Sequence, residues 1–212
     1  MSQTRRPAPY LRRYTSIASA LDILQNKHIT LLDPAKWDDQ NDVHYLRKYA
    51  EKMHYKNVLV LCFARRSETF HHWKVFTNKE DGICVEFSYS KLLKYIQNAE
   101  GTISRDVKYL EITKLSKSPP VPDELPFLKR YPYKDEKEFR IVYCDAAPKI
   151  PCLSIKIDLE CINRIIVNPW LPVPLFDSLK KTIHDIQDCS KLLVRSTTLL
   201  SNESWKAMAE NR

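Results

Sequence analysis

Glycine is almost absent from this sequence: Gly82 and Gly101 are the only two among 212 residues. The P-loop and the dinucleotide fingerprint both need several glycines close together, because glycine lets the backbone approach a phosphate closely. The sequence therefore contains neither motif. It also lacks an apolar run near the ~18 residues of a membrane span, and its basic start lacks the apolar stretch of a signal peptide. We expect a cytoplasmic protein that does not cross a membrane.

Paired cysteines are missing as well. The six cysteines form no CxxC pair, and His71 and His72 have no cysteine near them in the sequence: Cys62, Cys84, Cys144, Cys152, Cys161 and Cys189. Structural zinc sites usually show close ligand pairs, so this spacing argues against a metal site. The first three lie in apolar runs, where a free cysteine behaves as a small buried hydrophobe. We expect six free thiols.

Positive charge is in excess, with 34 Lys and Arg against 26 Asp and Glu, for a formal net charge of +8. An excess of this sign favours an anionic partner such as nucleic acid. However, the basic residues are scattered among acidic ones, as on an ordinary solvated surface, and no basic block carries interleaved aromatics. Charge alone leaves both interpretations open.

The hydrophobic pattern predicts one α+β domain. Alternating or continuous apolar runs predict strands over residues 11–14, 28–32, 57–63, 83–87, 107–112, 139–143, 153–157, 164–167 and 192–194. Helical spacing predicts helices over residues 16–26, 43–53, 67–77, 90–98 and 174–187. Several strands follow one another without a helix between them, which favours a mixed, largely antiparallel sheet flanked by helices. We expect a single domain over residues 1–200, with runs 57–63 and 139–143 together in the central sheet, and a flexible tail over 201–212.

Two polar clusters early in the chain are candidates for binding. Arg12, Arg13 and Tyr14 stand on the first predicted strand, where a guanidinium can hold a phosphate through forked hydrogen bonds or can lie on a solvated edge. The segment of residues 37–42 crowds acids and amides behind an aromatic: Trp37, Asp38, Asp39, Gln40, Asn41 and Asp42. These side chains could bind a hard cation or a ribose, or could cap the next helix.

Two later clusters carry aromatic and acidic residues. Trp73 and Phe76 share a face of a predicted helix just before Gly82, where they could stack on a flat ring or belong to the core. In residues 136–140, period-two alternation would place Glu136, Glu138 and Arg140 on one face of a strand. Such a row is either a solvated ion-pair ladder or a carboxylate held at a cleft, where it can stabilise developing positive charge.

These pieces together resemble the bacterial family called domain of unknown function 2971. The resemblance covers residues 11–170 and rests on the following segments: Tyr14, Trp37 to Gln40, Cys62 and Phe63, Trp73 with Phe76, Gly82 to Phe87, and Glu136 to Arg140. Asp38, Gln40 and Phe76 stand where the family pattern has Asn, Pro and Tyr.

The order of these parts is similar, more loosely, to the ADP-ribosyltransferase arrangement. That resemblance implies NAD as a substrate, with Arg13 and Tyr14 on the first strand and Trp73 or Phe76 stacking on nicotinamide. It implies that Glu138 binds the nicotinamide ribose and stabilises an oxocarbenium-like transition state, while Glu136 orients the acceptor. We expect Arg13, Trp73 and Glu138 to converge on one pocket, with Glu136 and Arg140 beside Glu138 and Trp37, Asp38, Asp39 and Asp42 as further candidates.

Three functions remain open from the sequence. The first is an NAD-dependent ADP-ribosyltransferase that modifies a macromolecule, either nucleic acid or protein. The second is a non-catalytic binding module or effector, in which the row at Glu138 is structural. The third is a nuclease or hydrolase that uses Asp38, Asp39 and Asp42 with a divalent metal, although no matching lysine or acid stands at strand spacing. The oligomeric state is not indicated by any pattern.

Overall fold

Nine strands of one large sheet and two strands of a small one make up the β-structure of this computed structural model, which describes residues 9–77 and 81–210. The large sheet contains β1 (Tyr10–Ser16), β2 (His28–Leu32), β3 (Asn57–Ala64), β4 (Gly82–Ser88), β5 (Thr102–Asp106), β8 (Glu138–Asp145), β9 (Cys152–Lys156), β10 (Ile162–Val167) and β11 (Val194–Ser196). The small sheet pairs β6 (Lys108–Leu110) with β7 (Leu128–Arg130) in parallel.

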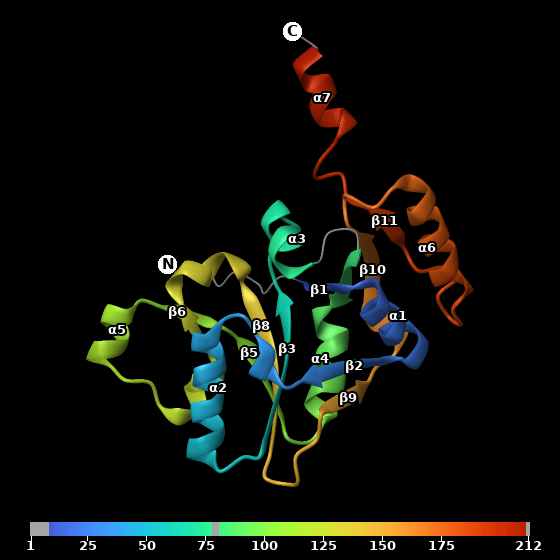
Figure 1. Ribbon diagram of the computed structural model, residues 1–212. Helices are drawn as coiled ribbons and strands as arrows, with labels where there is room; N and C mark the ends of the chain where they lie inside the picture. Colours follow the sequence, from blue (N-terminus) through green and yellow to red (C-terminus); the bar gives the residue numbers. More distant parts are fainter. Residues whose placement is uncertain (1–8, 78–80, 211–212) are drawn as a thin grey trace.

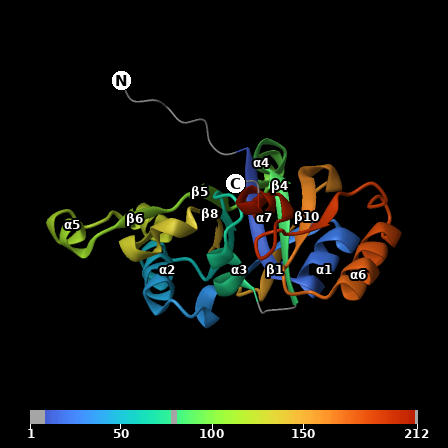
Figure 2. The ribbon, with the colours of Figure 1, turned by 90° about the horizontal axis from the view of Figure 1, so that it is seen from above.

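Helices stand between these strands in no regular alternation. They are α1 (Ile17–Asn26), α2 (Gln40–Met53), α3 (Phe70–Phe76), α4 (Tyr89–Asn98), α5 (Ile112–Lys117), α6 (Val173–Asp185) and α7 (Glu203–Glu210), with 3-10 turns η1 (Pro34–Lys36), η3 (Pro122–Phe127), η4 (Tyr131–Glu136) and η5 (Leu159–Cys161). Seen from above, α2 and α5 lie toward one end of the molecule and α1 and α6 toward the other (Figure 2). The chain is an α+β domain with a mixed, mostly antiparallel sheet flanked by helices, as the sequence predicts.

Strand β3 joins the two parts of the large sheet. Along one edge it pairs with β8 over its whole length, from Asn57 opposite Asp145 to Ala64 opposite Glu138. Its other edge is divided, because β1 meets it only at Ala64 and β2 meets it only at Val60. The stretch between those two points therefore faces a gap between β1 and β2 rather than a paired strand. All pairs in the large sheet are antiparallel except β10 with β11.

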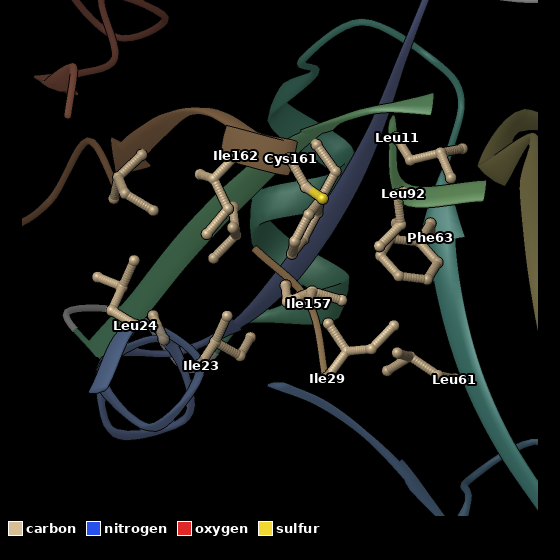
Figure 3. Close-up of a cluster of buried hydrophobic side chains, with 14 of the residues drawn as sticks. Leu11, Ile23, Leu24, Ile29, Leu61, Phe63, Leu92, Ile157, Cys161 and Ile162 are labelled. Carbon is tan, nitrogen blue, oxygen red and sulfur yellow. The ribbon is translucent and has the colours of Figure 1, made fainter. Parts of the chain in front are cut away.

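The main core covers one face of this sheet (Figure 3). Ala20, Ile23 and Leu24 of α1, together with Leu92 and Ile96 of α4, pack on the apolar side chains of the strands. The sequence produces this packing because α1 carries those residues at helical spacing, and because the Ser16 hydroxyl caps its first turn by accepting from the Ser19 N–H at 3.1 Å.

The opposite face carries two smaller clusters that leave room between them. Leu46 of α2 packs on Val60 and Val142, whereas Trp73 of α3 packs on Tyr14, Ala64 and Ile166. Helices α2 and α3 therefore cover different parts of the same face, with α2 in contact with β3 and α3 in contact with β1 (Figure 1).

The prediction that runs 57–63 and 139–143 share the central sheet is confirmed, since β3 and β8 pair directly. Helix α3 begins at Phe70 rather than Ser67, because Thr69 provides the capping hydroxyl to the His72 N–H at 3.2 Å. The expected strand over 107–112 is only three residues long and is followed by α5. Strand β5 was missed because TISRD is polar and pairs only with β8.

The C-terminal segment forms the helix α7, which no sequence pattern indicated. Every residue of α7 is exposed, and the helix extends away from the rest of the chain (Figure 1). The flexibility expected of residues 201–212 stays a prediction. All six cysteines are free, with Cys84, Cys161 and Cys189 buried and Cys152 exposed. Across residues 9–77 and 81–210, no helix has the length and apolarity that crossing a bilayer requires.

We expect Leu24→Ala to lower the free energy of unfolding by about 2–5 kcal/mol, because Leu24 is fully buried and its removal leaves a cavity in the main core. Urea denaturation followed by circular dichroism measures this loss. Leu193→Ala is the matched control, since Leu193 is 54% exposed. Equal effects of the two substitutions would contradict this account of the core.

Candidate active site

Glu138 opens strand β8 at the position where the backbone turns sharply. Lys137, just before it, has a left-handed backbone with φ 48°, so Glu136 belongs to η4 and not to the strand. The prediction that Glu136, Glu138 and Arg140 share one strand face is therefore wrong for Glu136. Glu138 and Arg140 do share a face, and Arg140 Nε donates to Glu138 Oε1 at 2.7 Å. The Glu138 N–H donates to the Tyr109 hydroxyl at 2.8 Å, which fixes the backbone there.

Arg140 is fully buried and ties three segments together. Its guanidinium forms a fork with both Asp42 oxygens, from Nη1 at 2.8 Å and Nη2 at 2.7 Å, and Nη1 also donates to the carbonyl of Pro126. Asp42 lies in the first turn of α2, and Pro126 lies in η3. A planar, permanently charged fork of this kind is what a buried carboxylate pair requires. Arg140 thus aligns Asp42 and Glu138 from behind, and it does not line the cavity in front of them.

Lys129 of β7 supplies the second cation of the cluster. Its Nζ lies 2.7 Å from Glu136 Oε2, 3.5 Å from Glu138 Oε2 and 3.8 Å from Asp42 Oδ2. Lys129 therefore brings Glu136 next to Glu138, although the two glutamates are not on the same strand face. Three carboxylates face two cations here, which leaves the cluster with one net negative charge when all five groups are ionised.

The protonation of the three carboxylates differs with their partners. Burial alone would raise the pKa of Glu138, but the charge and hydrogen bond of Arg140 and the charge of Lys129 outweigh it and hold the pKa at about 2. Burial raises the pKa of Asp42 despite Arg140, and it raises the pKa of Glu136 despite Lys129. Glu138 is consequently the most acidic of the three carboxylates.

The adjacent arginines of β1 have separate partners. Arg12 lies 2.6 Å from the buried carboxylate of Glu86 and donates to the Arg66 carbonyl, so it is committed to the fold. Arg13 instead reaches the divided edge of β3, where its Nη1 donates to the Cys62 carbonyl at 3.2 Å. Burial lowers the pKa of Arg13, while Cys62 and Glu138 act in the opposite direction. Its Nε and Nη2 make no hydrogen bond to the residues that the structure describes.

A set of stacked rings lies on the α3 side. The Tyr14 and His72 rings are parallel within 7°, with centroids 5.3 Å apart, and Phe76 lies against both. Trp73 meets the edge of Tyr14 and donates from Nε1 to Glu68 at 2.8 Å. Because Trp73 is fully buried, it cannot stack on a ligand, and the expectation that it lines the pocket is wrong. Phe76, at 38% exposure, is the ring that remains accessible.

Residues 37–42 combine capping with access to the cavity. Asp39 caps α2 by accepting from the N–H groups of Asn41 and Asp42, which is the capping role that the sequence left open. Asp38 is exposed, and the Trp37 ring lies 5.5 Å from the Arg140 guanidinium carbon. Part of this segment is helical, since α2 begins at Gln40 rather than at residue 43 as predicted.

These elements enclose a cavity of about 710 Å³ between α2 and α3. This volume lies within the range of small-molecule sites, roughly 300–1,000 Å³. The predicted residues that line it are Arg13, Tyr14, Trp37, Asp38, Asp39, Asp42, Phe76, Glu136 and Glu138. Lys129, Cys62 and Thr77 also line it and were missed. Nothing in the sequence around Lys129 distinguishes it from the other lysines.

The metal-dependent alternative finds little support in this arrangement. Both Asp42 oxygens are bound by Arg140, and Asp39 uses Oδ1 to cap α2, which leaves only its buried Oδ2 without a hydrogen-bond partner. Within the part of the chain that the structure describes, no group of three or more His, Cys, Asp or Glu side chains could hold a metal ion.

The solved structures that are similar to this chain include three of Thermus sp. 2.9 DarT: in complex with carba-NAD+, in complex with NAD+, and in complex with ADP-ribosylated ssDNA. They are 12%, 10% and 11% identical to this chain, with TM-scores of 0.46, 0.47 and 0.48. The matches cover 91%, 92% and 93% of this chain and 97%, 98% and 98% of the DarT chains. At this similarity a shared function does not follow, so the chemistry has to come from the site itself.

No family model and no curated protein matches the sequence. The resemblance to domain of unknown function 2971 therefore stays a prediction.

We expect Arg140→Met to lower the free energy of unfolding by about 3–5 kcal/mol, because it leaves the buried carboxylates of Asp42 and Glu138 without their main partner. Equilibrium urea denaturation measures the loss. Arg195→Met, at an exposed position of β11, is the control and should change the same quantity by less than about 0.5 kcal/mol. A loss as small as that of the control would show that the buried fork is not what holds α2 to β8.

The depressed pKa of Glu138 predicts a pH-dependent contribution to stability. A carboxylate with a folded-state pKa near 2 and an unfolded pKa of about 4.3 stabilises the fold fully above the unfolded value. That contribution is lost as the pH falls from about 4.3 toward 2. The difference in unfolding free energy between the wild type and Glu138→Gln should therefore be constant from pH 7 to 5 and shrink from pH 4.5 to 3. A difference that grows as the pH falls would reverse the assigned sign.

Proposed function

We propose that the chain is an NAD-dependent ADP-ribosyltransferase whose donor binds in the cavity between α2 and α3. The observation that carries the proposal is the meeting of Arg13 and Glu138 on this one cavity, although they are 125 positions apart in the sequence. A guanidinium with unused donors suits the diphosphate of NAD, and an ionised carboxylate suits its nicotinamide ribose.

Arg13 is assigned to the diphosphate or to the adjacent ribose. The chain has no glycine-rich loop to hold phosphates through backbone N–H groups, so a side chain has to provide the donors. Arg13 is held from one side by the Cys62 carbonyl, and its remaining nitrogens can form a fork with phosphate oxygens. Its orientation is thus set before a ligand arrives.

Glu138 is assigned to the nicotinamide ribose. When the bond from C1′ to the nicotinamide nitrogen breaks, its electron pair leaves with the nicotinamide and positive charge develops on the ribose. A carboxylate held in place by Arg140 and Lys129 stabilises that charge without having to reorganise. The net negative charge of the whole cluster acts in the same direction.

Phe76 supplies the accessible ring on which the nicotinamide would stack, with Tyr14 and His72 packed against it and Trp73 packed against Tyr14. Glu136 is assigned to the acceptor, because it lies at the edge of the same cluster and its raised pKa makes it a better base than Glu138. We propose a macromolecular acceptor, nucleic acid or protein, and the net charge of +8 favours an anionic one.

The decisive measurement is the release of nicotinamide from NAD, with transfer of labelled ADP-ribose to single-stranded DNA, RNA or cell-extract protein in parallel reactions. Glu138→Gln should lower the rate by about 10²- to 10³-fold, as the loss of one preorganised electrostatic contact does in other enzymes. Arg13→Met should instead weaken NAD binding.

Glu124→Gln is the matched control, because Glu124 pairs with the exposed Lys108 away from the cavity and should leave the rate unchanged. Absence of both nicotinamide release and label transfer by the wild type would overturn the enzyme proposal and favour the binding module. Titration calorimetry with NAD then shows whether the cavity binds the dinucleotide at all.

A further inference from the structure

The small sheet of β6 and β7, and not the large sheet, positions Lys129 beside the three carboxylates. Strand β7 pairs with β6 so that Lys129 lies opposite Tyr109, and the Tyr109 hydroxyl accepts from the Glu138 N–H at 2.8 Å. On its other side, the Lys129 ammonium lies 4.8 Å from the centre of the Tyr133 ring. The small sheet thus holds both the backbone of Glu138 and the cation beside its side chain.

The three carboxylates of the cluster do not share its two cations, Arg140 and Lys129, equally. Arg140 forms ion pairs with Asp42 and Glu138, and Glu136 pairs with Lys129. Lys129 is about 90% buried at its side chain, so its charge is only weakly screened by water. Removing that charge would leave Glu136 next to two other carboxylates with no ion pair of its own among the described residues.

The other groups around Glu136 do not replace Lys129. Asp42 of α2 and Glu138 of β8 are negative and disfavour a second ionised carboxylate nearby. Arg140 is turned toward those two acids. Burial lowers the pKa of His72 on α3 and raises that of Tyr109 on β6, so both are neutral near pH 7.

We propose that Lys129 is a positioning residue that keeps the carboxylate of Glu136 ionised and directed toward Glu138, where it receives the proton of the acceptor. This role rests on the proposed transferase function. In that reaction the acceptor oxygen or nitrogen forms a bond to C1′ of the ribose, the bond from C1′ to nicotinamide breaks with its electron pair on nicotinamide, and the acceptor proton passes to Glu136. Lys129 touches no reacting atom in this scheme. It acts mainly through Glu136, at 2.7 Å, and only secondarily on Glu138, which lies 3.5 Å away and is held by Arg140 at 2.7 Å.

Lys129→Met tests the proposal through the pH dependence of NAD cleavage. An opposite charge this close shifts a carboxyl pKa by about 1–3 units, so the acidic limb of the rate profile should move upward by about one pH unit or more. The value of kcat at pH 6 should fall, while KM for NAD changes less than about threefold. Lys129→Arg, which keeps the charge, should restore the wild-type profile.

Lys108→Met is the matched control, since the exposed Lys108 lies on the same small sheet but pairs with Glu124. It should leave the profile unmoved. A rise in KM with an unchanged acidic limb in Lys129→Met would overturn the proposal, because it would make Lys129 a residue that binds substrate directly.

A second measurement does not depend on activity. Carbon-13 NMR titration of the glutamate carboxyls, with Glu136 assigned from its missing signal in Glu136→Gln, reports the titration midpoint of Glu136 itself. The midpoint should rise by about one pH unit or more in Lys129→Met and stay within a few tenths of a unit in Lys108→Met. An unmoved midpoint refutes the role of Lys129 even in an active enzyme. A raised midpoint in a chain that cleaves no NAD overturns the transferase function and leaves the electrostatic role of Lys129 standing.

Should Lys129→Met fail to fold, Lys129→Gln serves in its place. Its amide can still donate a hydrogen bond to Glu136 but carries no charge, so the same upward movement is expected. If the midpoint does not move in Lys129→Gln, the hydrogen bond rather than the charge holds Glu136, and the proposal is wrong.

Discussion

The candidate site depends on the buried guanidinium of Arg140. It is the point at which α2, η3 and β8 meet, because one planar group satisfies both oxygens of Asp42, one oxygen of Glu138 and the carbonyl of Pro126. A buried charge is costly unless it is fully paired, and here every partner is also a part of the scaffold. The same contacts that hold α2 against the sheet therefore fix the carboxylate that faces the cavity. Stability and site geometry cannot be separated at this position.

The residues that line the cavity form two walls, one acidic and one aromatic. The acidic side is built by β8, η4 and β7, which bring Glu138, Glu136 and Lys129 together. The ring side is built by β1 and α3, which bring Tyr14 and Phe76 together. Arg13 stands between the two sides at the divided edge of β3. Ala64 lies in register between Arg12 and Glu138, and its small side chain leaves open the space in front of them. The result is a cavity whose polar and apolar walls come from segments far apart in the sequence.

Much of this was predictable, and the exceptions have physical causes. Alternation along residues 136–140 predicted that Glu138 and Arg140 share one face, and the long apolar run over residues 57–63 predicted the centre of the sheet. The prediction for Glu136 was wrong because Lys137 has a left-handed backbone conformation that interrupts the extended chain. A glycine would have indicated such a conformation in the sequence, but this position is a lysine. The sequence marks Trp73 and Phe76 equally as aromatic candidates for stacking. In the structure Trp73 packs against Tyr14 and is fully buried, whereas Phe76 stays accessible, and the sequence pattern cannot distinguish the two. Lys129 could not be found at all, since its importance comes entirely from the folding of β7 against β6.

The divided edge of β3 has a mechanical consequence. Among the residues that the structure describes, the strand pairing between the half of the sheet that carries β1, β4 and β10 and the half that carries β8 and β5 is limited to Arg12 opposite Ala64. Along most of this seam, cohesion comes from interlocked side chains rather than from a backbone ladder. The fit of the two halves to each other therefore depends on side-chain packing, such as that of the Phe63 ring on the Phe87 ring, whereas the strands within each half are held by continuous backbone hydrogen bonds.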